Sequence, residues 1–193
     1  KGGAGGNIAH QQVANAVADG SVLLFGSVGP LTIAPHLMKL AYDPFTDLAP
    51  ISGGVNFPNV LVVHKGVGVK TLAEFVQLEK KKPGGLDFAS TGPGSASHLA
   101  GELFNQRAGI DMVHVPYKST PLALTDTMSG HVQMCFADPV TSLPQVKAGT
   151  VRCLGVGSRG RYKLTPDIPT LIEQGIPDFE LMTWTGILMP RGV

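Results

Sequence analysis

The stretch LDFASTGPGSASH, residues 86–98, shows the local architecture of this chain most directly. Its first residues form a short strand-like run, and a loop of Gly and Ser residues follows. A helical pattern then begins at Ser97, places Leu99, Leu103 and Phe104 on one stripe, and ends before Gly109. A strand that leads through a short loop into a helix is the repeating unit of an α/β fold.

The same alternation continues downstream. Strand-like runs at 112–115, 131–136 and 151–156 alternate with helical patterns at 121–128 and 142–147. Parallel neighbours in a sheet need such crossover helices, so the pattern predicts a mainly parallel sheet.

Upstream, the pattern predicts a helix over 7–18 with Asn7 as its N-cap and a strand over 21–25. An apolar run at 60–63 predicts a strand buried on both faces. A helix over 71–80 begins with a capping box formed by Thr71 and Glu74, and 184–189 predicts a final strand.

Composition indicates a folded, weakly charged protein. The 193 residues are 43% apolar and 15% charged, with a net charge of +1. Disordered chains combine low hydrophobicity with high net charge, so disorder is excluded. The densest basic run, at 80–82, is typical of a solvated helix end and does not predict a nucleic-acid surface. Small molecules or proteins are therefore the expected partners.

Cys135 and Cys153 are the only cysteines, and their spacing matches no metal-binding motif. Each lies in an apolar run that is expected to form a strand. Two buried thiols are the first interpretation, and a disulfide between neighbouring strands remains open.

The loop at 90–97 is the first candidate site. Amide N–H groups at a helix N-terminus are unpaired and partly positive, so they favour an anion such as a carboxylate. Glycine allows close approach of the backbone, and hydroxyls add donors. Capping and turn geometry alone also explain such loops.

Other functions of this loop can be excluded from its sequence. A phosphate-binding P-loop needs Lys after its last glycine, where this chain has Ser95. A nucleophile elbow needs a GxSxG frame, which neither Ser95 nor Ser97 has. The histidines lack metal-ligand spacing. His98 is expected to be a first-turn residue that positions the loop.

Two further loops join a strand end to a helix start, and ligands of open α/β sheets bind at that edge. Lys118 and Ser119 lie in the second loop. The Lys118 side chain is either exposed to solvent or attracts an anionic ligand. Asp138 lies in the third and either caps the next helix or accepts hydrogen bonds from a ligand. The loops supply no nucleophile beside a base, so binding is expected and catalysis is not.

The chain resembles the Bug-type periplasmic receptors of tripartite tricarboxylate transporters, the TctC family, across nearly its whole length. The matching segments are GAGGNI at 3–8, ADG at 18–20, YDP at 42–44, DLAP at 47–50, PGGLDFAS at 83–90, SHLAGELF at 97–104, AGID at 108–111, HVPYK at 114–118, PDIPT at 166–170 and WTG at 184–186. The order and spacing of these segments make the resemblance specific.

The resemblance implies a periplasmic binding protein-like fold of type II, with two α/β domains of mainly parallel sheets around a ligand cleft. The expected domains are 1–63, 64–156 and a return segment 157–193 to the first domain. In this family the ligand carboxylate is held at loop ends of both domains. Carried over to this sequence, the resemblance implies Ser90, Thr91, Gly94 and Ser95 in the first loop, Lys118 and Ser119 in the second and Asp138 in the third. From the first domain it adds Ser27 and Val28, which follow the strand at 21–25.

The implied protein is a monomeric periplasmic receptor that delivers a small carboxylate to membrane permease subunits, with no cofactor and no metal. The sequence departs from the family pattern at Ser119, where glycine is usual, and at Ala34, which replaces the Asn of an Asn-Pro pair. Family members extend further at both ends, so the fragment is expected to be truncated, with part of the first-domain sheet and pocket missing.

Two alternatives come from other functional classes. One is an esterase or transferase that uses Ser95 or Ser97 with His98, although neighbours on one helix start cannot easily form a nucleophile–base pair. The other is a sensory module whose cleft signals to a membrane partner.

Overall fold

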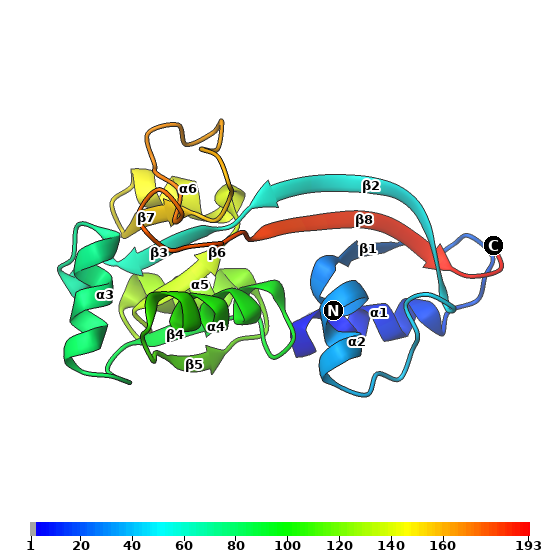
Figure 1. Cartoon of the computed structure of the whole chain (residues 1–193). Coiled ribbons are helices and arrows are strands. Elements are labelled where there is room, and N and C mark those ends of the chain that lie inside the picture. Colours follow the sequence, from blue (N-terminus) through cyan, green and yellow to red (C-terminus); the bar gives the residue numbers. More distant parts are fainter. Residues whose placement is uncertain (1–2) are drawn as a thin grey trace.

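The computed structural model describes residues 3–193, which form two lobes side by side (Figure 1). The small lobe contains a three-stranded antiparallel sheet of order β1-β8-β2, formed by β1 (Leu24–Ser27), β2 (Leu48–Pro58) and β8 (Met182–Pro190). Its helical segments are η1 (Ala4–Gly6), α1 (Asn7–Ala14), η2 (Gly29–Ile33) and α2 (Ala34–Leu37).

One side of the small sheet packs against α1 and η2. The core there consists of Val13, Leu24, Leu31, Tyr42, Leu48 and Leu188. Asn7 is the first residue of α1, and its N-cap is Gly6, so the predicted capping role of Asn7 is wrong. The Asn7 side chain instead accepts a hydrogen bond from the Tyr42 hydroxyl at 2.9 Å, which ties α1 to the loop after α2.

The large lobe contains a five-stranded sheet of order β5-β4-β6-β3-β7. Its strands are β3 (Val60–His64), β4 (Asp87–Ser90), β5 (Val113–Pro116), β6 (Met134–Ala137) and β7 (Val151–Val156). Its helices are η3 (Lys65–Val67), α3 (Leu72–Lys81), α4 (Ala96–Ala108), α5 (Thr120–Ser129) and α6 (Pro139–Lys147).

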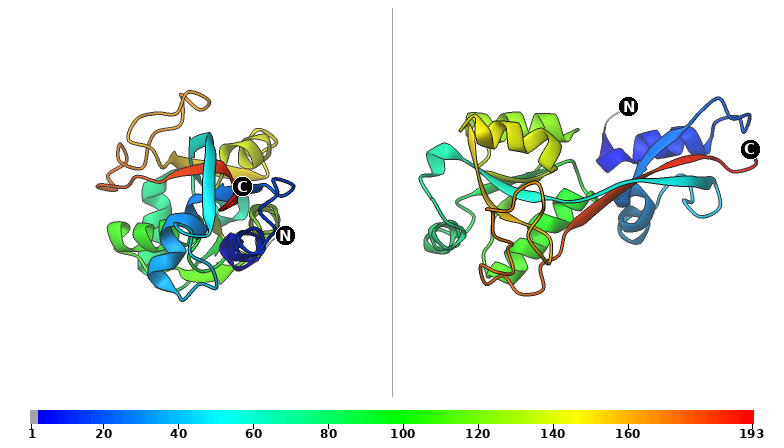
Figure 2. Two further views of the ribbon diagram at one scale, coloured as in Figure 1. Left: turned by 90° about the vertical axis from the view of Figure 1, so that its right-hand side faces the viewer. Right: turned by 90° about the horizontal axis from the view of Figure 1, so that it is seen from above.

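Helices cover both faces of this sheet (Figure 2). The alternation of β3 explains why, since Leu61 and Val63 pack into a core with α3 and α4, whereas Val60 and Val62 pack into a second core with α5 and α6. The apolar run at 60–63 predicts a strand buried on both faces, and that prediction is confirmed.

The α/β fold is as predicted, but the sheets are not mainly parallel. β4 is parallel to β5 and β6, whereas β3 is antiparallel to β6 and β7. The reason is that β3 continues from β2 of the small lobe and therefore enters the large sheet against the direction of its β–α units. The described sheet of the small lobe is antiparallel throughout.

The sheet pairing also locates the two connections between the lobes. β2 and β3 are separated only by Asn59, and the chain returns at the start of β8, after Leu181. The expected boundaries after residues 63 and 156 differ from this pairing: β3 belongs to the large sheet, and Leu171 and Phe179 of the return segment pack into the core of the large lobe.

The two cysteines are free thiols. Cys135 of β6 and Cys153 of β7 both pair with Val62, which lies on the strand between them. Two strand spacings separate them by roughly 9–10 Å, which is more than a disulfide spans.

Candidate functional site

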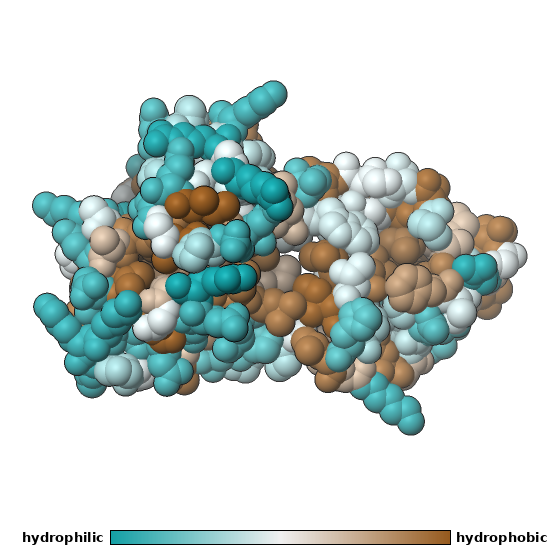
Figure 3. Space-filling model, in the orientation of Figure 1, coloured by the Kyte–Doolittle hydropathy of each residue, from teal (hydrophilic) through white to brown (hydrophobic). Residues whose placement is uncertain are grey.

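A cavity of about 170 Å³ lies between the two lobes. The space-filling view shows the surface hollowed at this junction (Figure 3). Both lobes contribute to its wall, which consists of Gly5, Ser27, Val28, Gly29, Phe57, Asn59, Thr91, Ser95, Ala96, Ser97, Thr120, Phe136, Asp138 and Thr183. Among residues 3–193 no group of three or more His, Cys, Asp or Glu side chains is placed to hold a metal ion.

The loop after β4 forms one side of the cavity. Ser95 is the N-cap of α4, and its hydroxyl accepts a hydrogen bond from the His98 amide at 3.2 Å. The Ser97 hydroxyl accepts the Thr91 amide at 3.0 Å and lies 3.2 Å from the Ser95 hydroxyl. Within the described chain no acceptor meets the N–H groups of Ala96 and Ser97 in the first turn of α4. These amides are therefore available to an anion in the cavity.

Ser90 and two histidines support this loop from behind. Ser90 is 1% exposed, and its hydroxyl accepts the Gly92 amide at 3.0 Å and lies 2.5 Å from Nε2 of His114. Burial and the neighbouring His98 lower the pKa of His114 to about 4, so its ring is neutral near pH 7 and can accept the Ser90 proton. His98 accepts the Gly94 amide at 3.4 Å, which confirms its expected role in positioning the loop.

The lobes touch through glycines next to the cavity. Gly94 has φ +75°, a conformation that side chains disfavour. A Cβ atom on Gly29 of the small lobe would lie 3.3 Å from the Gly94 carbonyl oxygen and 3.4 Å from Cα of Ser95. A Cβ atom on Gly5 would lie 3.1 Å from the Pro93 carbonyl oxygen. Glycine at these positions therefore allows the backbones of the two lobes to approach closely.

The small lobe presents the end of β1. Ser27 and Val28 line the cavity, and the Ser27 amide donates to Nε2 of His10 at 3.4 Å. Nδ1 of His10 lies 2.9 Å from the Gly6 carbonyl oxygen and donates to it, which leaves Nε2 as the acceptor. Burial lowers the pKa of His10, which favours this neutral form. The ring thus fixes the turn that presents Ser27.

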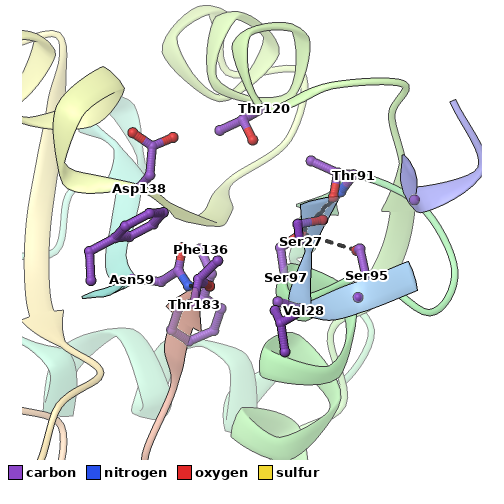
Figure 4. Close-up of a pocket in the computed structure, with 14 residues that line it drawn as sticks. Ser27, Val28, Asn59, Thr91, Ser95, Ser97, Thr120, Phe136, Asp138 and Thr183 are labelled. Carbon is purple, nitrogen blue, oxygen red and sulfur yellow. Dashed lines mark hydrogen bonds between the residues drawn. The ribbon is translucent and has the colours of Figure 1, made fainter. Parts of the chain in front are cut away.

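The opposite wall combines acceptors with aromatic rings (Figure 4). Asp138 is the N-cap of α6, and its two carboxylate oxygens accept from the amide and the hydroxyl of Thr141, each at 2.8 Å. It also lines the cavity, so the capping and ligand-facing interpretations of its sequence position are compatible. Asn59 donates its amide to the Thr183 hydroxyl at 2.5 Å, beside Phe136.

The structure brings Ser27, Val28, Thr91, Ser95 and Asp138 to one cavity. Ser90 and Gly94 lie behind that wall and shape the loop. Lys118 is exposed and is not among the lining residues, because the backbone turns at Ser119 into the start of α5. Thr120, two residues after Lys118, lines the cavity instead.

Sequence reasoning missed nine of the lining residues, which are Gly5, Gly29, Phe57, Asn59, Ala96, Ser97, Thr120, Phe136 and Thr183. Thr120 follows the second candidate loop directly, so its position in the chain was a usable signal. Asn59 and Thr183 are 124 positions apart and meet only because the two connections between the lobes run side by side.

Comparison with known proteins supports a common family. The profile described as tripartite tricarboxylate transporter family receptor matches residues 1–193. A UPF0065 protein from the tcbD-tcbE intergenic region of Pseudomonas sp. (strain P51) is 36% identical over 192 residues, which are 98% of this chain and 57% of that protein. The chain thus spans somewhat more than half the length of this curated relative.

Two solved structures share the fold. The periplasmic binding protein BugD superposes with a TM-score of 0.95 at 33% identity, with 100% of this chain and 64% of that chain covered. The R. palustris protein Rpa4515 with adipate superposes with a TM-score of 0.92 at 32% identity, with 97% and 63% covered. The matching family is described as one of receptors, and BugD is described as a periplasmic binding protein. The chain belongs to the tripartite tricarboxylate transporter receptor (TctC) family.

Proposed function

We propose that this protein is a periplasmic receptor that binds a small carboxylate between its lobes and delivers it to the membrane permease of a tripartite transporter. The observation that supports this most directly is that the amides of Ala96 and Ser97, which line a cavity formed by both lobes, have no acceptor among residues 3–193. A carboxylate placed there would accept hydrogen bonds from amides at the positive end of the α4 dipole.

The cavity suits binding better than reaction. The Ser97 hydroxyl is hydrogen-bonded to the hydroxyls of both Thr91 and Ser95, and within the described chain neither Ser95 nor Ser97 is hydrogen-bonded to a histidine ring. A serine nucleophile needs an adjacent base, so the hydrolase alternative lacks its central contact. The same hydroxyls are suitable donors for a bound carboxylate.

The position between two lobes is consistent with a receptor that changes shape when it is occupied. A ligand held by Ser27 and Val28 on one side and by α4 on the other would stabilise the closed arrangement. In the function proposed here, permease subunits would recognise such a closed form, and the likeness to the periplasmic binding protein BugD supports a periplasmic role.

Isothermal titration of the full-length protein tests the proposal. A panel of small carboxylates is compared with the corresponding primary amides, which have nearly the same shape but no negative charge. We expect saturable binding of at least one acid and none of its amide. Equal binding of acid and amide, or no binding by any acid, would contradict the proposal.

A further inference from the structure

We infer that the ligand carries an ammonium group in addition to its carboxylate, so that the site selects an amino-carboxylate over a dicarboxylate. The inference rests on the proposed function and narrows it. It starts from the charge of the cavity wall. Asp138 is the only Asp, Glu, Lys, Arg or His among the lining residues of the described chain, and the wall contains no cationic side chain.

Donors and acceptors occupy opposite sides of this cavity. The close-up places Thr91, Ser95 and Ser97 on one side and Asp138, Asn59 and Thr183 on the other (Figure 4). The first side offers hydroxyls and the unpaired amides of α4, which suit a carboxylate. The second side offers the Asp138 carboxylate and the Asn59 carbonyl oxygen as acceptors, beside the Thr183 hydroxyl, and these acceptors suit a group that donates hydrogen bonds.

Asp138 retains capacity to accept such a donor. Each carboxylate oxygen has two lone pairs, and Thr141 occupies one on each oxygen, at 2.8 Å. Asn59 adds a second acceptor, because its NH₂ group is directed to Thr183 and no described donor meets its carbonyl oxygen. An ammonium group has three donors and a positive charge, so it complements both residues.

A second carboxylate on the ligand would meet the wrong chemistry at this wall. It would lie near the Asp138 carboxylate, and like charges in a partly buried site repel strongly. No lining Lys or Arg in the described residues offsets that repulsion. The related protein Rpa4515 has a structure with adipate, a dicarboxylate, so the inference separates this chain from that relative.

The cavity volume limits the ligand to a small molecule. A cavity of roughly 150 Å³ holds benzene, which has six heavy atoms. The volume of about 170 Å³ is therefore suited to a ligand of similar or slightly larger size when the lobes are arranged as here. Short amino acids meet this limit.

Titration of matched ligand sets tests the inference on the full-length protein. Each set contains an amino acid, the dicarboxylate and the simple acid of the same carbon number, such as 4-aminobutyrate, succinate and butyrate. Sets of three, four and five carbons, together with the corresponding α-amino acids, cover different separations of the two groups. We expect the best amino acid to bind on the order of 100-fold more tightly than the dicarboxylate of its set.

The variant Asp138→Asn is the matched test of cause, because Asn is as good an N-cap as Asp and preserves α6. We expect it to weaken amino acid binding and strengthen dicarboxylate binding, so that the preference falls at least tenfold. A dicarboxylate that binds more tightly than every amino acid, or a preference unchanged in Asp138→Asn, overturns the inference and leaves the proposed function intact. No binding by any acid in any set refutes both.

Discussion

The most discriminating prediction concerns Ser95, which caps α4 and lines the cavity. Replacing it by Asp preserves the cap, since Asp and Ser are equally good N-caps. It also introduces a negative charge where the proposed carboxylate is held. Two like charges about 4 Å apart in a site of effective dielectric constant about 20 repel by about 4 kcal/mol. A loss of affinity on the order of 1,000-fold is therefore expected.

The matched control is Ser95→Ala, which removes the cap but adds no charge. It should destabilise the protein by about 1 kcal/mol, a fall in Tm of about 2–4 °C for a chain of this size. It should weaken carboxylate binding far less than Ser95→Asp. Thermal unfolding and titration calorimetry on both variants separate the two effects. Carboxylate binding by a stably folded Ser95→Asp protein within tenfold of the wild type would refute placement of the anion at α4.

Four other changes probe the structure around the site. Gly29→Ala should weaken ligand binding several-fold with little change in Tm, because its Cβ atom would lie 3.3 Å from the Gly94 carbonyl oxygen in the loop before α4 of the other lobe. Unchanged affinity by calorimetry would show that close contact of the lobes at Gly29 is not needed for binding. Because the pKa of His114 is lowered to about 4 in the folded state, the unfolded state binds a proton between pH 4 and 6.5 that the folded state does not, so the free energy of unfolding should be greatest above pH 6.5 and fall as the pH drops toward 4. Denaturant unfolding of His114→Gln should show a weaker dependence of this free energy on pH. An unchanged dependence would count against His114 as its origin. Gly101→Ala should lower the free energy of unfolding by on the order of 1–3 kcal/mol, since its Cβ atom would overlap the Phe88 ring. Urea unfolding measures this loss, and adding Phe88→Leu to the variant should restore part of it. No change in the free energy of unfolding would contradict this packing. Thiol titration of the denatured, unreduced protein should find both cysteines free, whereas a mass two hydrogens lighter would indicate a bond between them.

The local units of the large lobe could be predicted because their signals lie within a few residues. The capping box of Thr71 and Glu74 begins α3 as expected. Gly109 and Gly130 end α4 and α5 in the left-handed conformation that glycine adopts readily. The start and end of a helix depend on backbone hydrogen bonds that neighbouring residues satisfy, so both can be predicted from a few consecutive residues.

Strand β2 was not predicted, because its cause is distant in the chain. The segment around Ile51–Val55 shows no regular alternation, and its pairing with β8 contains register shifts at Pro50/Ser52 and Gly53/Asn56. The paired residues of β2 and β8 are between 124 (Pro58↔Met182) and 142 (Leu48↔Pro190) positions apart in the sequence. Without that partner, a glycine-containing run has no strand signal of its own.

The site was predictable only on one side for the same reason. Ser95 and Asp138 lie at helix starts, where Ser and Asp are typical N-cap residues, so their positions could be predicted from the local sequence. Lys118 suggested an electrostatic contact, but charge alone does not fix the direction of a long side chain, and it lies in solvent. Asn59 and Thr183 have no local signal, because their role depends on the path of two connections.

Those two connections have a mechanical consequence. The backbone N–H of Asn59 donates to the Leu181 carbonyl oxygen at 3.2 Å, and the backbone N–H of Gly157 donates to the backbone carbonyl oxygen of Asn59 at 2.9 Å. Both connections between the lobes are therefore hydrogen-bonded at Asn59, which makes this the expected hinge if one lobe rotates against the other. Because Asn59 also lines the cavity, a ligand bound there would contact the expected hinge directly, so that binding and rotation of the lobes would be coupled at one residue.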